Sequence, residues 1–160
     1  MEKIGSLILF RGINAITIDN KGRIAMPTRY RDVLLQSGNH RLVMTIDTDS
    51  PCLLLYPIQE WEIIEQKIQA LPSFNKAARR IQRLLIGHAT EIDMDNSGRL
   101  LVPQLLRDYA DLEKNIMLIG QSKKFELWDD KKWHKNREAW LKEEEHNNDE
   151  LPAELQNLAL

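Results

Sequence analysis

The sequence contains one short motif twice, and this repetition restricts the fold more than any other feature of the chain. Residues 19–27 and 95–103 both read Asp-Asn-x-Gly-Arg, then Ile or Leu, two variable residues and Pro. A second stretch of similarity aligns residues 53–61 with residues 125–133. Units repeated in this way often cannot bury their apolar faces alone, so we expect the two copies to share one hydrophobic core.

The residues around each motif predict a fixed order of short strands. Before the first motif, Ile16 and Ile18 alternate with Thr17, which is the two-residue period of a strand. The Asp-Asn-x-Gly segment then predicts a tight connection to a second short strand, because Gly22 and Gly98 can adopt a positive φ. We therefore expect each copy to begin with a hairpin-like pair of strands.

A proline marks the start of a helix after each of these strand pairs. Pro27 and Pro103 suit the first turn of a helix, where φ is already set and no N–H group is required. Four apolar runs then predict a second pair of strands in each copy, at residues 42–46, 53–56, 116–119 and 125–128.

Helical patterns follow each copy. Apolar residues recur at spacings of three and four after Pro57, residues 76–85 predict another helix, and a charged helix is expected from Trp133 to about Glu145.

The predicted fold class is α+β, with two tandem repeats of hairpin, helix and hairpin plus flanking helices. The predicted parts are an extension (1–9), a first module (10–62), linking helices (63–85), a second module (86–133) and a carboxyl-terminal helix with a mobile tail (134–160).

Composition and charge restrict the function. With 42% hydrophobic and 29% charged residues, the chain is expected to be a soluble globular protein. The formal net charge is −2, yet residues 1–45 carry seven Lys or Arg against three Asp or Glu, a local net charge of +4. Residues 129–160 carry five against nine, a local net charge of −4. A basic surface at the front of the chain therefore remains compatible with a nucleic-acid partner.

The residue types needed for a metal site or an active site are not gathered in the sequence. Cys52 is the only cysteine, which excludes an intrachain disulfide, and the four histidines are scattered without ligand spacing. We found no nucleophile elbow and no glycine-rich phosphate loop. The sequence thus predicts no catalytic residue, no metal, no cofactor and no small-molecule substrate. The short apolar run at residues 7–10 predicts neither an export signal nor a membrane span, and a cytoplasmic location is expected.

The two turns carry side chains suited to nucleic acid. A tight turn projects cations from a rigid tip, where arginine can hold guanine or phosphate and lysine can meet phosphate as a point charge. The candidate DNA-binding residues are Lys21, Arg23, Arg29, Arg31, Arg99 and Arg107. Gly22, Gly98, Pro27 and Pro103 are interpreted as structural residues of the turns.

The repeated Asp-x-x-Gly-Arg motif with its following Pro and Arg resembles the swapped-hairpin DNA-binding modules of the AbrB and SpoVT type. Its doubling resembles the MraZ family, as do Phe-Arg-Gly at residues 10–12, Pro-Cys-Leu-Leu-Leu-Tyr-Pro at 51–57 and Gln-Arg-Leu-Leu-Ile-Gly-His-Ala at 82–89. The resemblance implies a pseudo-dimeric β-barrel core. It implies a transcriptional regulator, more specifically a repressor, that is located on the nucleoid. It also implies binding to direct repeats in the promoter of the division and cell-wall gene cluster, and a ring-shaped homo-oligomer.

The resemblance makes Arg23 the main expected DNA contact, with Lys21 beside it. Arg99 and Arg107 are the counterparts in the second copy, where Ser97 replaces the lysine and predicts a weaker contribution. Single-copy relatives often place basic residues at positions that hold Ile16, Ile92, Asp32 and Asp108 in this chain, so those contacts cannot be transferred. The alternative hypothesis is a protein-interaction module of the antitoxin type, which shares the fold and uses a flexible tail such as the one beyond His146.

Overall fold

Both copies of the repeat fold into the same order of elements in the computed structural model, which describes residues 9–146 and 152–158. The chain divides into two units, residues 1–130 and residues 131–160. The first copy contains β1 (Phe10–Thr17), β2 (Arg23–Ala25), α1 (Thr28–Gln36), β3 (Arg41–Ile46) and β4 (Leu53–Pro57). The second contains β5 (Thr90–Asp93), β6 (Arg99–Leu101), α4 (Gln104–Tyr109), β7 (Asn115–Ser122) and β8 (Lys124–Asp129).

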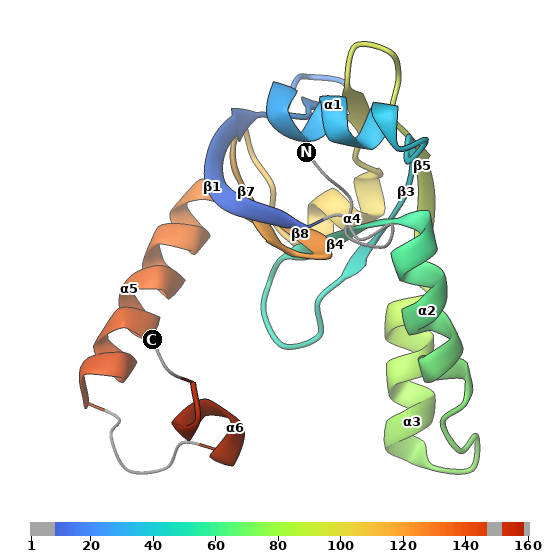
Figure 1. The fold of residues 1–160 in the computed structure, drawn as a ribbon, viewed down its shortest axis with the longest axis vertical. Coiled ribbons are helices and arrows are strands. Elements are labelled where there is room, and N and C mark those ends of the chain that lie inside the picture. Colours follow the sequence, from blue (N-terminus) through green and yellow to red (C-terminus); the bar gives the residue numbers. More distant parts are fainter. Residues whose placement is uncertain (1–8, 147–151, 159–160) are drawn as a thin grey trace. The chain divides into compact units, whose positions relative to one another are not determined.

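The remaining helices follow the two copies, as the apolar spacing predicts. After the first copy come α2 (Ile58–Gln69), α3 (Lys76–Ile81) and a π-helical turn, η1 (Gln82–Ile86). The α2 and α3 helices lie side by side as a helical hairpin (Figure 1), and the side-chain amide of Gln82 donates to the Ile68 carbonyl at 3.1 Å. The helix α5 (Asp130–His146) begins at the last residue of the first unit and otherwise belongs to the second unit, together with the short α6 (Ala153–Gln156).

Four of the six strand pairings among the described residues of the first unit join one copy to the other. One antiparallel sheet has the order β1-β7-β8-β4-β3-β5, and β2 pairs with β6 in a second sheet of two strands. The first strand of each copy pairs with the third strand of the other, because β1 lies on β7 and β5 lies on β3. The fourth strands, β4 and β8, pair directly. Neither copy could form this sheet alone.

The observed strand pairing differs from the hairpin that was expected at the start of each copy. In the first copy, β1 and β2 are joined only by an isolated bridge between Ile18 and Ile24, and β2 forms its ladder with β6. The physical reason is burial, because Ile24 and Leu100 face each other across the copies and are 1% and 0% exposed. The expected closed barrel is not seen either, since the described strands form an open sheet that ends at β1 and β5.

A single hydrophobic core joins the two copies, which confirms the expectation drawn from the repeat. It extends from Phe10 on β1 to Leu127 on β8 and includes residues of every strand pair named above. At its centre, the Phe125 ring lies 4.3 Å from the Phe10 ring and 4.9 Å from the Tyr30 ring, measured between centroids. The Tyr30 hydroxyl donates to the Arg11 carbonyl and accepts from the Asn14 amide. These contacts fix α1 against β1.

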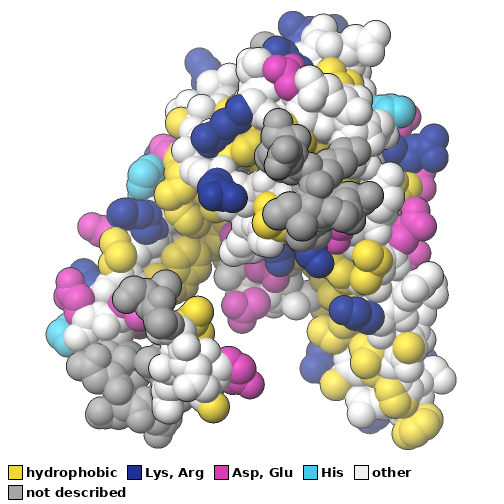
Figure 2. Space-filling model, in the orientation of Figure 1, with side chains coloured by type: hydrophobic (Ala, Val, Ile, Leu, Met, Phe, Trp, Pro, Cys, Tyr) yellow, Lys and Arg dark blue, Asp and Glu magenta, His cyan; other side chains and the backbone are white. Residues whose placement is uncertain are grey.

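Large apolar side chains are exposed at the far end of the α2–α3 hairpin. They include Leu71 and Phe74, of which Phe74 is 88% exposed, and Ile63 in the middle of α2 is also exposed. Figure 2 shows hydrophobic side chains gathered over the end of the hairpin, away from the sheet. This surface is separate from the two repeated turns.

Candidate nucleic-acid interface

The two repeated motifs meet in the ribbon formed by β2 and β6. Arg23 lies opposite Leu101, Ile24 opposite Leu100, and Ala25 opposite Arg99. Because side chains alternate between the two faces of a strand, Ile24 and Leu100 point into the core, and the other four residues share the outer face. The ribbon therefore presents Arg23 and Arg99 on the same outer face, one from each copy.

An aspartate organises each turn. One carboxylate oxygen of Asp19 accepts hydrogen bonds from the backbone N–H groups of Lys21 and Arg23, both at 2.9 Å. Asp95 accepts the equivalent bonds from Ser97 and Arg99, also at 2.9 Å. The short aspartate side chain of each motif thus caps the backbone of its own turn.

The backbone also ties each copy to the turn of the other. The Met26 N–H donates to the Gly98 carbonyl, and the Val102 N–H donates to the Gly22 carbonyl, both at 2.8 Å. Gly22 and Gly98 have φ of +85° and +79°, which confirms the positive φ expected at both turns. Because these bonds join the copies symmetrically, both turns are held rigidly at the two ends of the ribbon.

Arg31 and Arg107 pack over the turns rather than extending from them. Arg31, from the first copy, covers the turn of the second copy and donates to the Ser97 carbonyl at 3.1 Å. Arg107 covers the turn of the first copy, and its Nε donates to the Val102 carbonyl at 3.0 Å. A Cβ atom on Gly98 would lie 2.3 Å from Arg31 Cδ, and one on Gly22 would lie 2.7 Å from Arg107 Cζ. Both arginines thus contact the turn that the other copy contributes.

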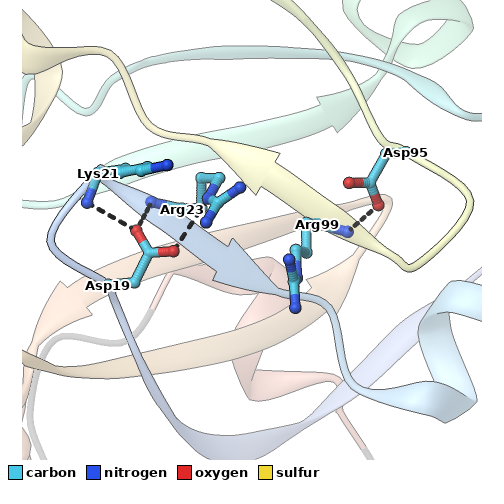
Figure 3. A network of polar contacts seen from close by, with 5 residues as sticks. All are labelled: Asp19, Lys21, Arg23, Asp95 and Arg99. Atoms are coloured by element: carbon cyan, nitrogen blue, oxygen red, sulfur yellow. Dashed lines mark hydrogen bonds and ion pairs between the residues drawn. The ribbon is translucent and has the colours of Figure 1, made fainter.

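Arg23 and Arg99 differ in their partners. The Arg23 Nε atom forms an ion pair of 2.9 Å with Asp19 on the exposed surface (Figure 3). Among residues 9–146 and 152–158, no ion pair to the Arg99 guanidinium is found, because Asp95 bonds only to backbone groups. Exposed ion pairs contribute little to stability, so Arg23 can exchange Asp19 for another anion at small cost. The side chains of Arg23 and Arg99 line one shallow hollow together with Thr17, Asp19, Ile24 and Ala25.

The other predicted site residues lie in two places. Lys21 is exposed at the tip of the first turn, beside Arg23. Arg29 is not brought to the ribbon, because its guanidinium donates to the Asn14 side chain at 2.7 Å and lies 4.6 Å from the centre of the Tyr30 ring. Pro27 and Pro103 each stand one residue before the first helical residue, as the caps of α1 and α4.

Protonation of Asp19 is expected to weaken the turn of the first copy. The hydrogen bond from the Arg23 backbone N–H is the largest cause that lowers the pKa of Asp19, and the Arg23 side chain adds to it. A carboxyl group whose pKa is lowered on folding stabilises the folded turn above its ordinary pKa. That contribution is lost as the pH falls through the lowered pKa.

Asp19 and Asp95 were not predicted as site residues, although their equivalent places in the two motifs were the signal for them.

In the part of the chain that the structure describes, one group of potential metal ligands lies outside the ribbon. Asp47, Cys52 and Glu126 place ligand atoms within 4.8 Å of one another. Burial is the main cause that raises the pKa of the Cys52 thiol, and the neighbouring carboxylates raise it further. The thiol therefore stays protonated and donates to the Asp47 carboxylate at 3.7 Å. Glu126 accepts instead from Trp128 Nε1 at 3.0 Å, and Cys52 is a buried core residue as expected.

Replacing Gly98 by alanine tests the packing of Arg31 on the turn. We expect Gly98→Ala to lose about 1–2 kcal/mol through its positive φ, and about 1 kcal/mol more because Arg31 must leave the Ser97 carbonyl. Gly38→Ala is the matched control, since Gly38 has φ of +75° and an added Cβ would meet no atom within 4 Å. Urea denaturation measures both free energies of unfolding, and equal losses would contradict this role of Arg31.

The fold and the ribbon define an α+β protein built from two tandem modules that share one core. The family model described as MraZ protein, antitoxin-like, matches residues 9–84 and 85–154. The chain belongs to the MraZ family.

Proteins named "Transcriptional regulator MraZ" are similar to this chain over 152 residues, which is 95% of this chain and the whole of each relative. They come from Legionella pneumophila (strain Corby) at 57% identity, Coxiella burnetii (strain Dugway 5J108-111) at 55% and Pectobacterium atrosepticum at 50%. Their names describe regulators of transcription rather than enzymes. Among the described residues, the helices are too short or too polar to cross a membrane.

Proposed function

We propose that this chain is a sequence-specific DNA-binding regulator of transcription and that the β2–β6 ribbon is its DNA-contacting element. The observation that carries the proposal is the shared outer face of Arg23 and Arg99, which the two copies contribute to one rigid ribbon. The major groove of B-form DNA accepts a two-stranded ribbon, and arginine there can bond both acceptors of guanine. Lys21 at the turn is placed to meet a phosphate.

The contacts of the candidate residues support different roles for them within this element. Arg23 and Arg99 are proposed to contact base edges or phosphates, and Lys21 to contact phosphate. Arg31 and Arg107 are proposed as positioning residues, because both are bonded to backbone near the turns. Arg29 is proposed to contact DNA only at the border of the site, since it is bonded to Asn14 on β1.

The family resemblance supports finer proposals. The chain is proposed to act as a repressor on the nucleoid in the cytoplasm, at direct repeats in the promoter of the division and cell-wall gene cluster. It is also proposed to form a ring-shaped homo-oligomer, in which several ribbons combine weak contacts into tight binding. The pairing of equivalent strands across the copies supports a pseudo-dimeric core of the AbrB type. The proposed domain limits remain those of the two modules at residues 10–62 and 86–133.

The experiment that tests the function is fluorescence anisotropy with two duplexes at several salt concentrations. One duplex is the region directly upstream of the coding sequence of this chain, and the other is the same sequence scrambled. The proposal predicts tighter binding to the upstream region, with an affinity that falls steeply as salt rises. Equal weak binding to both duplexes would contradict it and favour the interaction module of the antitoxin type. The tail on which that alternative depends lies partly outside the described residues, at 147–151 and 159–160.

Replacing Asp19 by asparagine should strengthen DNA binding. The asparagine oxygen can still accept the two backbone bonds of the turn, whereas the charge that pairs with Arg23 and repels phosphate is removed. We expect affinity to rise about two- to fivefold at low salt, and the gain to shrink at high salt. Asp49→Asn, in the exposed loop between β3 and β4, is the charge-matched control. Weaker binding by Asp19→Asn would show that the ion pair is needed in the complex.

A further inference from the structure

Two apolar side chains share the outer face of the ribbon with the arginines. Leu101 lies directly opposite Arg23, and Ala25 lies directly opposite Arg99. Leu101 is 53% exposed, although its neighbour Leu100 on the same strand is fully buried. Leucine and alanine at this repeated position mean that only the Arg23 end of the ribbon carries a large apolar side chain.

The chemistry of the major groove offers one apolar group to such a side chain. Guanine presents two acceptors that suit arginine, whereas thymine presents its 5-methyl group, which suits an apolar contact. We propose that Leu101 is a specificity-determining residue, which contacts the methyl group of a thymine beside the base pair contacted by Arg23. This inference rests on the proposed function and adds the base that the ribbon selects.

The spacing of the ribbon fits this assignment. Side chains directly opposite each other in an antiparallel pair have Cβ atoms about 4.5–5.5 Å apart. Neighbouring bases on one strand of DNA are about 3.4 Å apart along the helix axis. Two long side chains such as Arg23 and Leu101 can therefore reach the same base step. Ala25 is shorter, so we expect no comparable contact beside Arg99.

The competing explanation for an exposed leucine is contact with another protein surface, such as a second copy of this chain. Leu101 lies opposite Arg23 on a ribbon of only two strands and shares its outer face with Arg23 and Arg99. A protein contact there would have to cover both guanidinium groups or pair them with acids. A DNA groove satisfies the arginines and the leucine together, and this favours DNA.

The test replaces thymine by uracil, which removes only the methyl group from the base pair. A tight duplex is first selected with the wild-type protein from a randomised library, and each of its thymines is then replaced in turn. For wild type, we expect one or two neighbouring positions at which uracil weakens binding about fourfold, the equivalent of ~0.8 kcal/mol for one buried methyl group. For Leu101→Ser, we expect thymine and uracil at those positions to bind equally.

Leu105→Ser is the matched control. Leu105 is 66% exposed on α4, outside the ribbon, so this variant should distinguish thymine from uracil as wild type does. The inference is overturned if wild type shows no position sensitive to uracil, or if Leu101→Ser keeps the full sensitivity. It is also overturned if Leu101→Ser changes the oligomer mass in light scattering and keeps that sensitivity, which would assign Leu101 to a protein contact. If the library yields no preferred duplex, the proposed function itself fails, and this result is distinct from the others.

Discussion

Replacing Arg23 and Arg99 together by alanine is expected to lower affinity for the upstream duplex at least about 30-fold. A bidentate pair between arginine and guanine discriminates by about 1–3 kcal/mol, so two lost pairs amount to at least ~2 kcal/mol. The fold should be unchanged, because both side chains lie on the outer face of the ribbon and the turns are held by backbone bonds. Anisotropy titrations measure the affinity, and circular dichroism checks the fold.

The control for this prediction removes the same charge from another surface. Arg79 and Arg80 are exposed on α3, so Arg79→Ala with Arg80→Ala subtracts two cations without touching the ribbon. We expect this control to lose only the small share of affinity that depends on net charge. If both double variants lose the same affinity, binding depends on overall charge and the ribbon has no special role.

Replacing Phe125 by alanine is expected to destabilise the protein by about 3–5 kcal/mol, the usual cost of removing a large buried aromatic side chain. Phe125 is 0% exposed and packs between Phe10 and Tyr30, so its loss opens a cavity where β1, β8 and α1 meet. Chemical denaturation measures the free energy of unfolding. Because the core is shared, we expect both copies to unfold in one transition.

Phe74→Ala serves as the matched control for the core. This phenylalanine is 88% exposed in the turn between α2 and α3, so its removal should change the free energy of unfolding by about 0.5 kcal/mol or less. A comparable loss for both variants would mean that Phe125 does not hold the shared core together. Two separate transitions in the wild type would contradict the shared core more directly.

The local sequence pattern predicted most of the helices and strands, because the periods of a helix and a strand depend only on neighbouring residues. The helices after Pro27, Pro57 and Pro103 follow from apolar spacing and proline chemistry. The pairing of strands depends on contacts far apart in the sequence, such as that of Phe10 with Ser122. No local pattern distinguishes a hairpin within one copy from a ribbon between two copies, and this is why the expected hairpin was wrong.

The site could be predicted in part for the same reason. The turns and the exposure of Lys21 follow from the motif, and the repeat places Arg23 and Arg99 at equivalent positions. Their meeting on one face follows only from the register of β2 and β6. The bonds of Arg29 with Asn14, and of Arg31 with the opposite turn, depend on tertiary packing that spacing alone does not encode.

The most direct test of the ribbon as the DNA-contacting element is cleavage of bound DNA by a tethered iron chelate. Ser97→Cys places the chelate on the turn of the second copy, and Ser73→Cys places it on the exposed loop between α2 and α3. The native Cys52 is fully buried, so it should not take up the label. We predict strand cleavage at the centre of the protected site from the Ser97→Cys protein and none there from the Ser73→Cys protein. Cleavage confined to the Ser73→Cys protein, or equal cleavage by both, would contradict the assignment of the ribbon as the DNA-contacting element.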